Sequence, residues 1–126
     1  MLPSAMLARI VTDGDWRIPA VRVAEARARG GGRPAYVYQS VIGGFPHIAF
    51  DGGPAQGATR ALLEAYAPAW ANFASTGDPN HAALPAWVPY APDDATRPRA
   101  TMMFGYEPAL VTDPWPRERA AWDGVR

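Results

Sequence analysis

Large apolar side chains recur at three- and four-residue spacing along residues 58–75, and this spacing predicts a long amphipathic helix. Pro68 lies inside the pattern. A proline there removes one backbone hydrogen bond and clashes with the preceding turn, so it should kink the helix or divide it in two. The predicted buried face consists of Leu62, Leu63, Tyr66, Trp70 and Phe73.

Two helices are expected before the first strand. Residues 3–12 carry apolar side chains at helical spacing, and residues 16–29 repeat them at three and four. Asp13 and Asp15 are expected to cap the second helix, because carboxylates accept hydrogen bonds from the free N–H groups at a helix start. The expected inward stripe of the second helix is Trp16, Pro19–Ala20, Val23–Ala24 and Arg27–Ala28.

The remaining elements follow from turn residues and short apolar runs. Gly30–Gly32 should end the second helix. Ala35–Gln39 is aromatic and β-branched and predicts a strand. A glycine-rich loop over residues 40–57 follows, and a Pro-rich irregular stretch covers residues 76–99. The other expected features are Trp87 and Tyr90 as apolar anchors, two short strands at 101–104 and 109–111, and a short helix within 115–122.

Composition narrows the class of protein and of partner. A chain of 126 residues fits one domain. Twelve basic residues balance twelve acidic ones without a basic stripe, so neither nucleic acid nor an anionic membrane is expected as a partner. The chain has no cysteine, which excludes disulfides and Cys-based zinc sites. The sequence shows no signal peptide and no apolar run near the ~20 residues of a membrane span, and the localisation stays open.

The most specific text in the chain is Trp70-Ala71-Asn72-Phe73-Ala74-Ser75-Thr76-Gly77-Asp78-Pro79-Asn80. It closely resembles the W-x-x-F-A-x-T-G-D-P-N signature near the C-terminus of type-B carboxylesterases, a family that includes para-nitrobenzyl esterases and is related to cholinesterases. Gly77 followed by Pro79 is typical of a helix stop, so we interpret the motif as structural. The features around it follow the family's order, and the resemblance covers nearly the whole chain but only about the last quarter of a typical member.

This resemblance implies an α/β fold. Residues 1–126 would form one unit, the C-terminal fragment of a carboxylesterase domain. In α/β-hydrolase terms the fragment would hold the last core strand, the histidine loop, the long helix, a short C-terminal β-hairpin and a final helix. Its sheet would be incomplete, because the other core strands belong to the part of such an enzyme that precedes it.

The resemblance also implies a catalytic role for His47. In this family the general-base histidine lies on the loop after the last core strand, and His47 aligns with it. The family usually continues as H-x-x-E, whereas here Phe50 stands in the place of the glutamate and Asp51 follows it. The other histidine, His81, lies among prolines after the helix stop and is expected to be solvated.

The nucleophile that this chemistry requires is missing. Esterases of this fold use a serine on a Gly-x-Ser-x-Gly turn, then an acid, then the histidine. Ser4, Ser40 and Ser75 lack the flanking glycines, and Gly30–Gly32 is better explained as the end of a helix than as an oxyanion turn. The chain alone is therefore predicted to be inactive, and it calls for no cofactor or metal. In the full-length parent, the expected partners are a small-molecule ester substrate and the missing N-terminal part of the hydrolase.

Two alternatives stay open beside the fragment of a carboxylic-ester hydrolase. The chain could be a non-catalytic remnant that acts as a small folded or partner-binding module. It could also be a small independent enzyme that uses His47 with Asp51, although no motif supports this. Upstream DNA that encodes Gly-x-Ser-x-Gly would favour the parent hydrolase, and its absence would favour the remnant.

Overall fold

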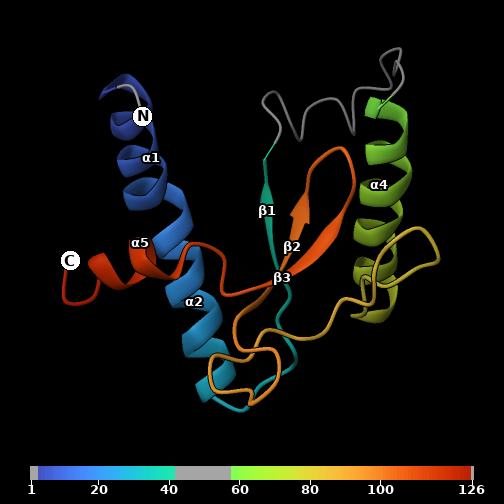
Figure 1. The fold of residues 1–126 in the computed structure, drawn as a ribbon. Helices are drawn as coiled ribbons and strands as arrows, with labels where there is room; N and C mark the ends of the chain where they lie inside the picture. The colour runs from blue at the N-terminus through green and yellow to red at the C-terminus, as the bar shows by residue number, and fades with distance from the viewer. Residues whose placement is uncertain (1–2, 42–57, 126) are drawn as a thin grey trace.

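The computed structural model describes residues 3–41 and 58–125. Three helical segments precede the first strand, a long helix follows it, and a hairpin and a short helix close the chain (Figure 1). The elements are α1 (Pro3–Thr12), the π-helical turn η1 (Asp13–Arg17), α2 (Ile18–Arg29), β1 (Val37–Ser40), α4 (Ala58–Thr76), β2 (Ala100–Phe104), β3 (Ala109–Thr112) and α5 (Pro116–Ala121).

The first two helices are joined without a break, and the predicted cap between them is wrong. Thr12, which precedes η1, and Arg17, which precedes α2, both have right-handed helical backbone angles and make no side-chain cap. The carboxylate of Asp13 instead accepts hydrogen bonds from Nε and Nη2 of Arg17, at 2.6 and 2.7 Å. Both residues are buried. Because the helical backbone is continuous through Asp13, no free N–H groups of a helix start are present for it to cap, and its carboxylate pairs with Arg17 one turn later.

The predicted inward face of residues 16–29 is confirmed at Ala24, which is buried, but is wrong at Trp16 and Val23, which are 75% and 71% exposed. The helix instead buries Ile18, which is outside the predicted stripe, next to Arg17 and its ion pair with Asp13. The predicted helix end is confirmed: Gly30 caps α2, and Gly31 takes a left-handed φ of 64°, which a glycine adopts without strain.

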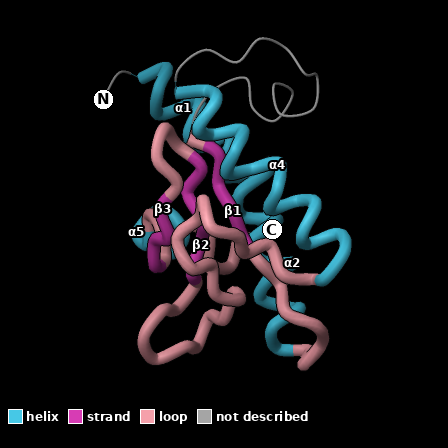
Figure 2. The backbone as a smooth tube through the Cα atoms, turned by 90° about the vertical axis from the view of Figure 1, so that its right-hand side faces the viewer, coloured by secondary structure: helices cyan, strands magenta, loops and turns pink. Residues whose placement is uncertain are grey.

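The strands form one mixed sheet in the order β1–β2–β3. β1 pairs parallel with β2, with Val37 opposite Thr101, and β2 pairs antiparallel with β3, with Ala100 opposite Thr112. The three predicted strands are therefore present, but the first belongs to the same sheet as the hairpin. Figure 2 shows the strands side by side, with α4 along one flank of the sheet. A small mixed sheet with helices is compatible with an incomplete α/β fold.

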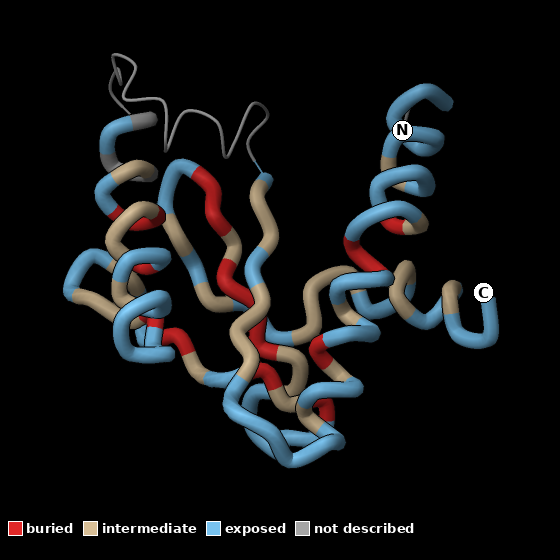
Figure 3. The backbone as a smooth tube through the Cα atoms, turned by 180° about the vertical axis from the view of Figure 1, so that it is seen from behind, coloured by how far each residue is buried: buried red, intermediate tan, exposed pale blue. Residues whose placement is uncertain are grey.

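The core lies between α4 and the sheet. Ala65, Tyr66 and Ala69 of α4 are almost fully buried, and the ring centroids of Tyr66 and Phe104 lie 5.0 Å apart in an edge-to-face contact. The predicted anchors Trp87 and Tyr90 are both buried. Buried positions follow β2 and the helix surfaces that face it (Figure 3). The cluster consists of Ala65, Tyr66, Ala69, Trp87, Met102 and Phe104.

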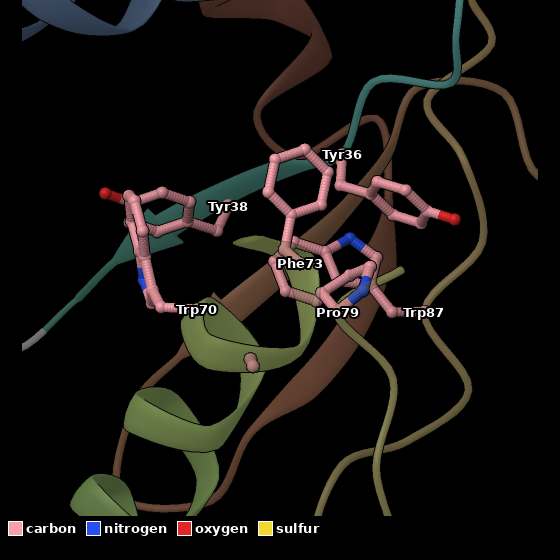
Figure 4. A pocket seen from close by; sticks show the side chains of 7 residues that line it. Tyr36, Tyr38, Trp70, Phe73, Pro79 and Trp87 are labelled. Atoms are coloured by element: carbon pink, nitrogen blue, oxygen red, sulfur yellow. The ribbon is translucent and has the colours of Figure 1, made fainter. Parts of the chain in front are cut away.

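The long helix α4 runs from Ala58 to Thr76 with Pro68 inside it. Its predicted buried face is confirmed at Tyr66 but is wrong at Trp70 and Phe73, which are each 43% exposed. Trp70 lies beside Tyr38, and Phe73 lies beside Tyr36 (Figure 4). The spacing thus identified the face of α4 that meets the sheet, but the described residues leave this end of that face partly exposed. No described helix is both long and apolar enough to span a membrane.

Burial of Tyr90 should make the free energy of unfolding depend on pH above about 10. Its buried hydroxyl has no hydrogen-bond partner in the described part of the chain, and burial raises its pKa to about 12. Because the folded state holds this proton more tightly than an unfolded chain, with a pKa of about 10, the free energy of unfolding should fall as the pH rises from about 10 to 12.

Tyr90→Phe should therefore lessen this fall while leaving stability at pH 7 unchanged or slightly higher, because it removes an unpaired buried hydroxyl. Urea unfolding at pH 7, 10 and 11 measures both effects. Tyr106→Phe, at an exposed tyrosine, is the matched control and should change neither. A clear loss of stability at pH 7 in Tyr90→Phe would show that the hydroxyl has a partner.

Candidate functional site

The carboxyl end of β1 is where the predicted catalytic loop begins. The N–H of Val41 donates to the carbonyl of Phe104 at 3.0 Å, which holds the end of β1 against β2. The chain then continues into residues 42–57. His47 and Asp51 lie in this segment, outside the described residues. Ligands of open α/β sheets bind beyond the carboxyl ends of the strands, so the predicted position of the loop agrees with this rule.

A hollow of about 300 Å³ lies beside this end of β1. It is lined by α1, η1, the end of β1 and Trp115. The guanidinium carbons of Arg9 and Arg17 lie 5.4 and 5.6 Å from the Trp115 ring centroid, within the range of cation–π attraction. Arg17 is paired with Asp13, and Arg9 donates to Glu118 at 3.1 Å. The positive charges of this hollow are thus already balanced by carboxylates.

The signature Trp70–Asn80 has a structural role, as its sequence predicts. Gly77 takes a left-handed φ of 82°, and its N–H donates to the carbonyl of Phe73 at 2.8 Å, which closes α4. The Thr76 hydroxyl donates to the Asn72 carbonyl and accepts from the Asp78 N–H. The side-chain oxygen of Thr76 therefore bridges the last helical turn and the chain that leaves it.

Asn80 connects this helix stop to the core. Its side-chain oxygen accepts from the Trp87 N–H at 2.7 Å, and its amide nitrogen donates to the Trp87 carbonyl at 2.8 Å. The same side chain and its backbone N–H also donate to Asp78. These bonds from Asn80 lower the pKa of the Asp78 carboxyl below its usual value. The final Asn of the signature thereby fixes the buried Trp87 against the end of α4.

The three serines occupy different parts of the structure. Ser4 is exposed on α1, and Ser40 is half-buried at the end of β1. The Ser75 hydroxyl donates to the carbonyl of Ala71 at 2.6 Å, within the last turn of α4. Ser75 is thus a helix-end residue, as its sequence context predicts.

His81 is not merely solvated, and that prediction is wrong. Its Nε2 lies 2.7 Å from the Ala65 carbonyl, and its Nδ1 lies 3.3 Å from the Ala83 N–H. A carbonyl only accepts, so Nε2 carries the proton and Nδ1 accepts. Ala65 lies one turn before Pro68, where the proline ring disturbs the helical hydrogen bonds. His81 therefore has a structural role at this turn.

Comparison with solved structures identifies relatives of this arrangement, although no protein-family model matches the sequence. A carboxylesterase of Geobacillus stearothermophilus, solved at pH 6.2, is 29% identical with a TM-score of 0.78, over 97% of this chain and 29% of its own length. The structure of the same enzyme at pH 6.8 is 32% identical with a TM-score of 0.73. That match covers 90% of this chain and 27% of the enzyme. The chain is a relative of the carboxylesterases.

The predicted family is thus confirmed. A para-nitrobenzyl esterase shares the fold at 22% identity with a TM-score of 0.74, over 89% of this chain and 26% of its own. The chain spans between a quarter and a third of the length of these enzymes. It therefore corresponds to a segment of an α/β-hydrolase carboxylesterase.

A second feature of this carboxylesterase segment is an open aromatic hollow of about 100 Å³ on the α4 side of β1 (Figure 4). Tyr38 lies 5.8 Å from Trp70, and Tyr36 lies 6.0 Å from Phe73, between ring centroids. Helical spacing predicts Trp70 and Phe73 in the core, so this surface is not predicted from the sequence. The alternation of Tyr36 and Tyr38, which puts both on one face of the extended chain that enters β1, was the signal that could have indicated it. Ala69, Pro79 and Trp87 complete the lining.

Proposed function

We propose that this chain is the part of a carboxylic-ester hydrolase that supplies the general-base histidine, His47. The observation that carries the proposal is the similarity to the Geobacillus stearothermophilus carboxylesterase, which extends over nearly the whole chain. The family signature at Trp70–Asn80 and the position of His47 shortly after β1 support it. The proposed substrate is a small-molecule carboxylic ester.

In this proposal the catalytic groups are divided between this chain and the rest of the enzyme. The remainder provides a serine, the acid that orients the histidine, and the N–H groups that stabilise the oxyanion. His47 accepts the proton of the serine hydroxyl as its oxygen attacks the ester carbonyl. His47 then donates that proton to the leaving alcohol, and water completes hydrolysis of the acyl-enzyme by the same route.

The isolated 126-residue chain should therefore be inactive, because a general base without an activated hydroxyl has nothing to activate. Incubation with a chromogenic short-chain ester should give only background hydrolysis. A fluorophosphonate probe should label none of Ser4, Ser40 and Ser75, as judged by intact mass. The Geobacillus stearothermophilus carboxylesterase, treated in parallel, is the positive control. Hydrolysis together with labelling of one of these serines would contradict the proposal.

One observation favours a second function, that of a non-catalytic partner-binding module. Trp70, Phe73 and Tyr38 are partly exposed and lie together on one surface. The DNA upstream of the coding region distinguishes the hydrolase segment from the partner-binding module. A Gly-x-Ser-x-Gly sequence there, in frame or in a frameshifted remnant, supports the hydrolase, and its absence supports the module.

A further inference from the structure

A small hollow of about 40 Å³ lies between α2, the sheet and α5, on the other side of β1 from α4. Tyr90 lines this hollow and is only 3% exposed. Its buried hydroxyl has no hydrogen-bond partner among the described residues. A buried polar group without a partner is unusual, because burial costs it the hydrogen bonds that it makes to water. Beside a hollow, such a hydroxyl indicates where a bound ligand could accept a hydrogen bond.

Two arginines of the same hollow also have hydrogen-bond donors to spare. Arg119 donates from Nε and Nη2 to the Asp113 carboxylate at 2.9 and 3.0 Å. Arg99 donates from Nε to Glu25 and from Nη1 to the Pro92 carbonyl, at 3.2 and 3.3 Å, which is long for a hydrogen bond. Within the described part of the chain, Nη1 of Arg119 and Nη2 of Arg99 make no hydrogen bond. The lining thus offers more donors than acceptors.

A second hollow of about 180 Å³ adjoins the first and shares Val21, Arg99 and Arg119 with it. It lies between α2 and the end of the chain, where Figure 1 shows α5 beside α2. The Arg22 guanidinium donates to the Trp122 carbonyl at 3.0 Å and holds this end of the chain against α2. The two hollows form one continuous space, which we call the arginine recess.

The arginine recess has one more positive charge than negative charge. Glu25 is shared between Arg29 and Arg99, so one carboxylate serves two guanidinium groups. Arg17, which also lines the recess, is neutralised by Asp13. The other charged groups are four arginines and three carboxylates: Arg22, Arg29, Arg99 and Arg119 with Glu25, Asp113 and Asp123. An excess of one positive charge matches one monovalent anion.

The backbone holds the donors of the arginine recess in place. The Arg99 N–H donates to the Ala91 carbonyl at 2.9 Å, and the Asp113 N–H donates to the Arg99 carbonyl at 3.3 Å. These bonds join the start of β2 to the segment that contains Tyr90 and to the segment that leads into α5. A single water needs about 10–15 Å³ of such space, so the inner hollow has room for one small ion without any movement of the backbone.

We propose that the arginine recess binds one small monovalent anion of the chloride type, with the Tyr90 hydroxyl and the guanidinium groups of Arg99 and Arg119 as its hydrogen-bond donors. The bound ion would connect α5 to the start of β2, because Arg119 belongs to α5 and Arg99 precedes Ala100. An ion that binds the folded state alone stabilises it in proportion to the logarithm of its concentration once the site is nearly saturated. None of these groups takes part in the proposed ester hydrolysis.

Chloride binding to the full 126-residue chain tests the proposal directly. At pH 7 and constant ionic strength, with sodium gluconate as the balancing salt, the protein should broaden the ³⁵Cl NMR line saturably. The urea midpoint should rise as chloride replaces gluconate. Tyr90→Phe should weaken chloride binding at least ~10-fold, because it removes a hydrogen bond to a charged acceptor. Tyr106→Phe, at an exposed tyrosine, is the matched control and should bind as the parent chain does.

A gain-of-binding variant tests the charge balance. Asp123 lines the outer hollow and forms no ion pair with another described residue. Asp123→Asn should tighten chloride binding by about 3-fold, because it removes a nearby negative charge. Glu64→Gln is the matched control, since Glu64 is exposed on α4, which does not line the recess. Unchanged or weaker binding in Asp123→Asn would overturn the proposal, and so would equal tightening in Glu64→Gln.

Two further results would overturn the proposal even if Tyr90→Phe did not fold. Equal urea midpoints in chloride and gluconate, without saturable ³⁵Cl broadening, would mean that salt only screens the surface charges. Displacement of chloride by sulfate at equal ionic strength would mean that the recess takes a divalent anion. In gluconate alone, Tyr90→Phe should be no less stable than the parent chain. Its stability deficit should appear only as chloride is added.

Discussion

Replacing His47 by alanine in an active hydrolase that contains this chain should lower kcat by about 10³- to 10⁶-fold, as loss of a triad member does. Without the imidazole, nothing accepts the serine proton during attack or returns it to the leaving alcohol. The host is a graft, the Geobacillus stearothermophilus carboxylesterase in which this chain replaces the segment it matches. The measurement is kcat for a chromogenic ester. A burst of alcohol release should disappear together with turnover, because acylation itself needs the general base.

His81→Ala is the matched control for this experiment, because both bonds of His81 are to backbone groups. It should reduce the free energy of unfolding and leave kcat of the folded enzyme within a few-fold. Turnover of His47→Ala close to that of the parent graft would reject the role of His47. If only His81→Ala lowered kcat, the general base would be assigned to His81 instead of His47.

Phe104→Ala should be the most destabilising single core change, at about 3–5 kcal/mol. Phe104 is fully buried, and its ring makes edge-to-face contacts with Tyr66, Trp87 and Tyr38 at 5.0, 5.8 and 5.9 Å. Truncation would leave a cavity bordered by three rigid rings that cannot collapse into it. Urea unfolding of the graft measures the loss, with an unchanged m-value as the check for two-state behaviour.

Tyr106→Ala is the control for that measurement, because Tyr106 follows β2 by two residues and is 69% exposed. Its cost should stay within about 0.5 kcal/mol. A cost for Phe104→Ala below about 1 kcal/mol would mean that β2 and α4 do not form the core.

Local chemistry was sufficient to predict most elements of this chain. The helix stop at Gly77, the strand near Tyr36 and the anchors Trp87 and Tyr90 all depend on neighbouring residues, and the structure confirms them. The buried face of residues 16–29 includes Arg17, which pairs with Asp13 one turn earlier. A pattern of apolar residues cannot anticipate a face that buries an arginine, because arginine counts as polar in that pattern.

Burial was harder to predict than helix or strand. Trp70 and Phe73 are on the expected face of α4, but a pattern of side chains does not reveal whether the covering layer lies in the same chain. The parallel pairing of β1 with β2 was also beyond local patterns, because about 60 residues separate the partners. His47 stays a prediction, since it lies outside the described residues.

The pairing of β1 with β2 also sets an order of events at the ribosome. Val37 meets Thr101 only after about 60 further residues have been synthesised, which takes roughly 3–12 s at ordinary elongation rates. During that interval β1 lacks its β2 partner, while α2 is already complete. Nascent chains of this sequence are consequently most exposed to chaperone capture or misassociation in that window, and slower elongation between α4 and β2 would lengthen it.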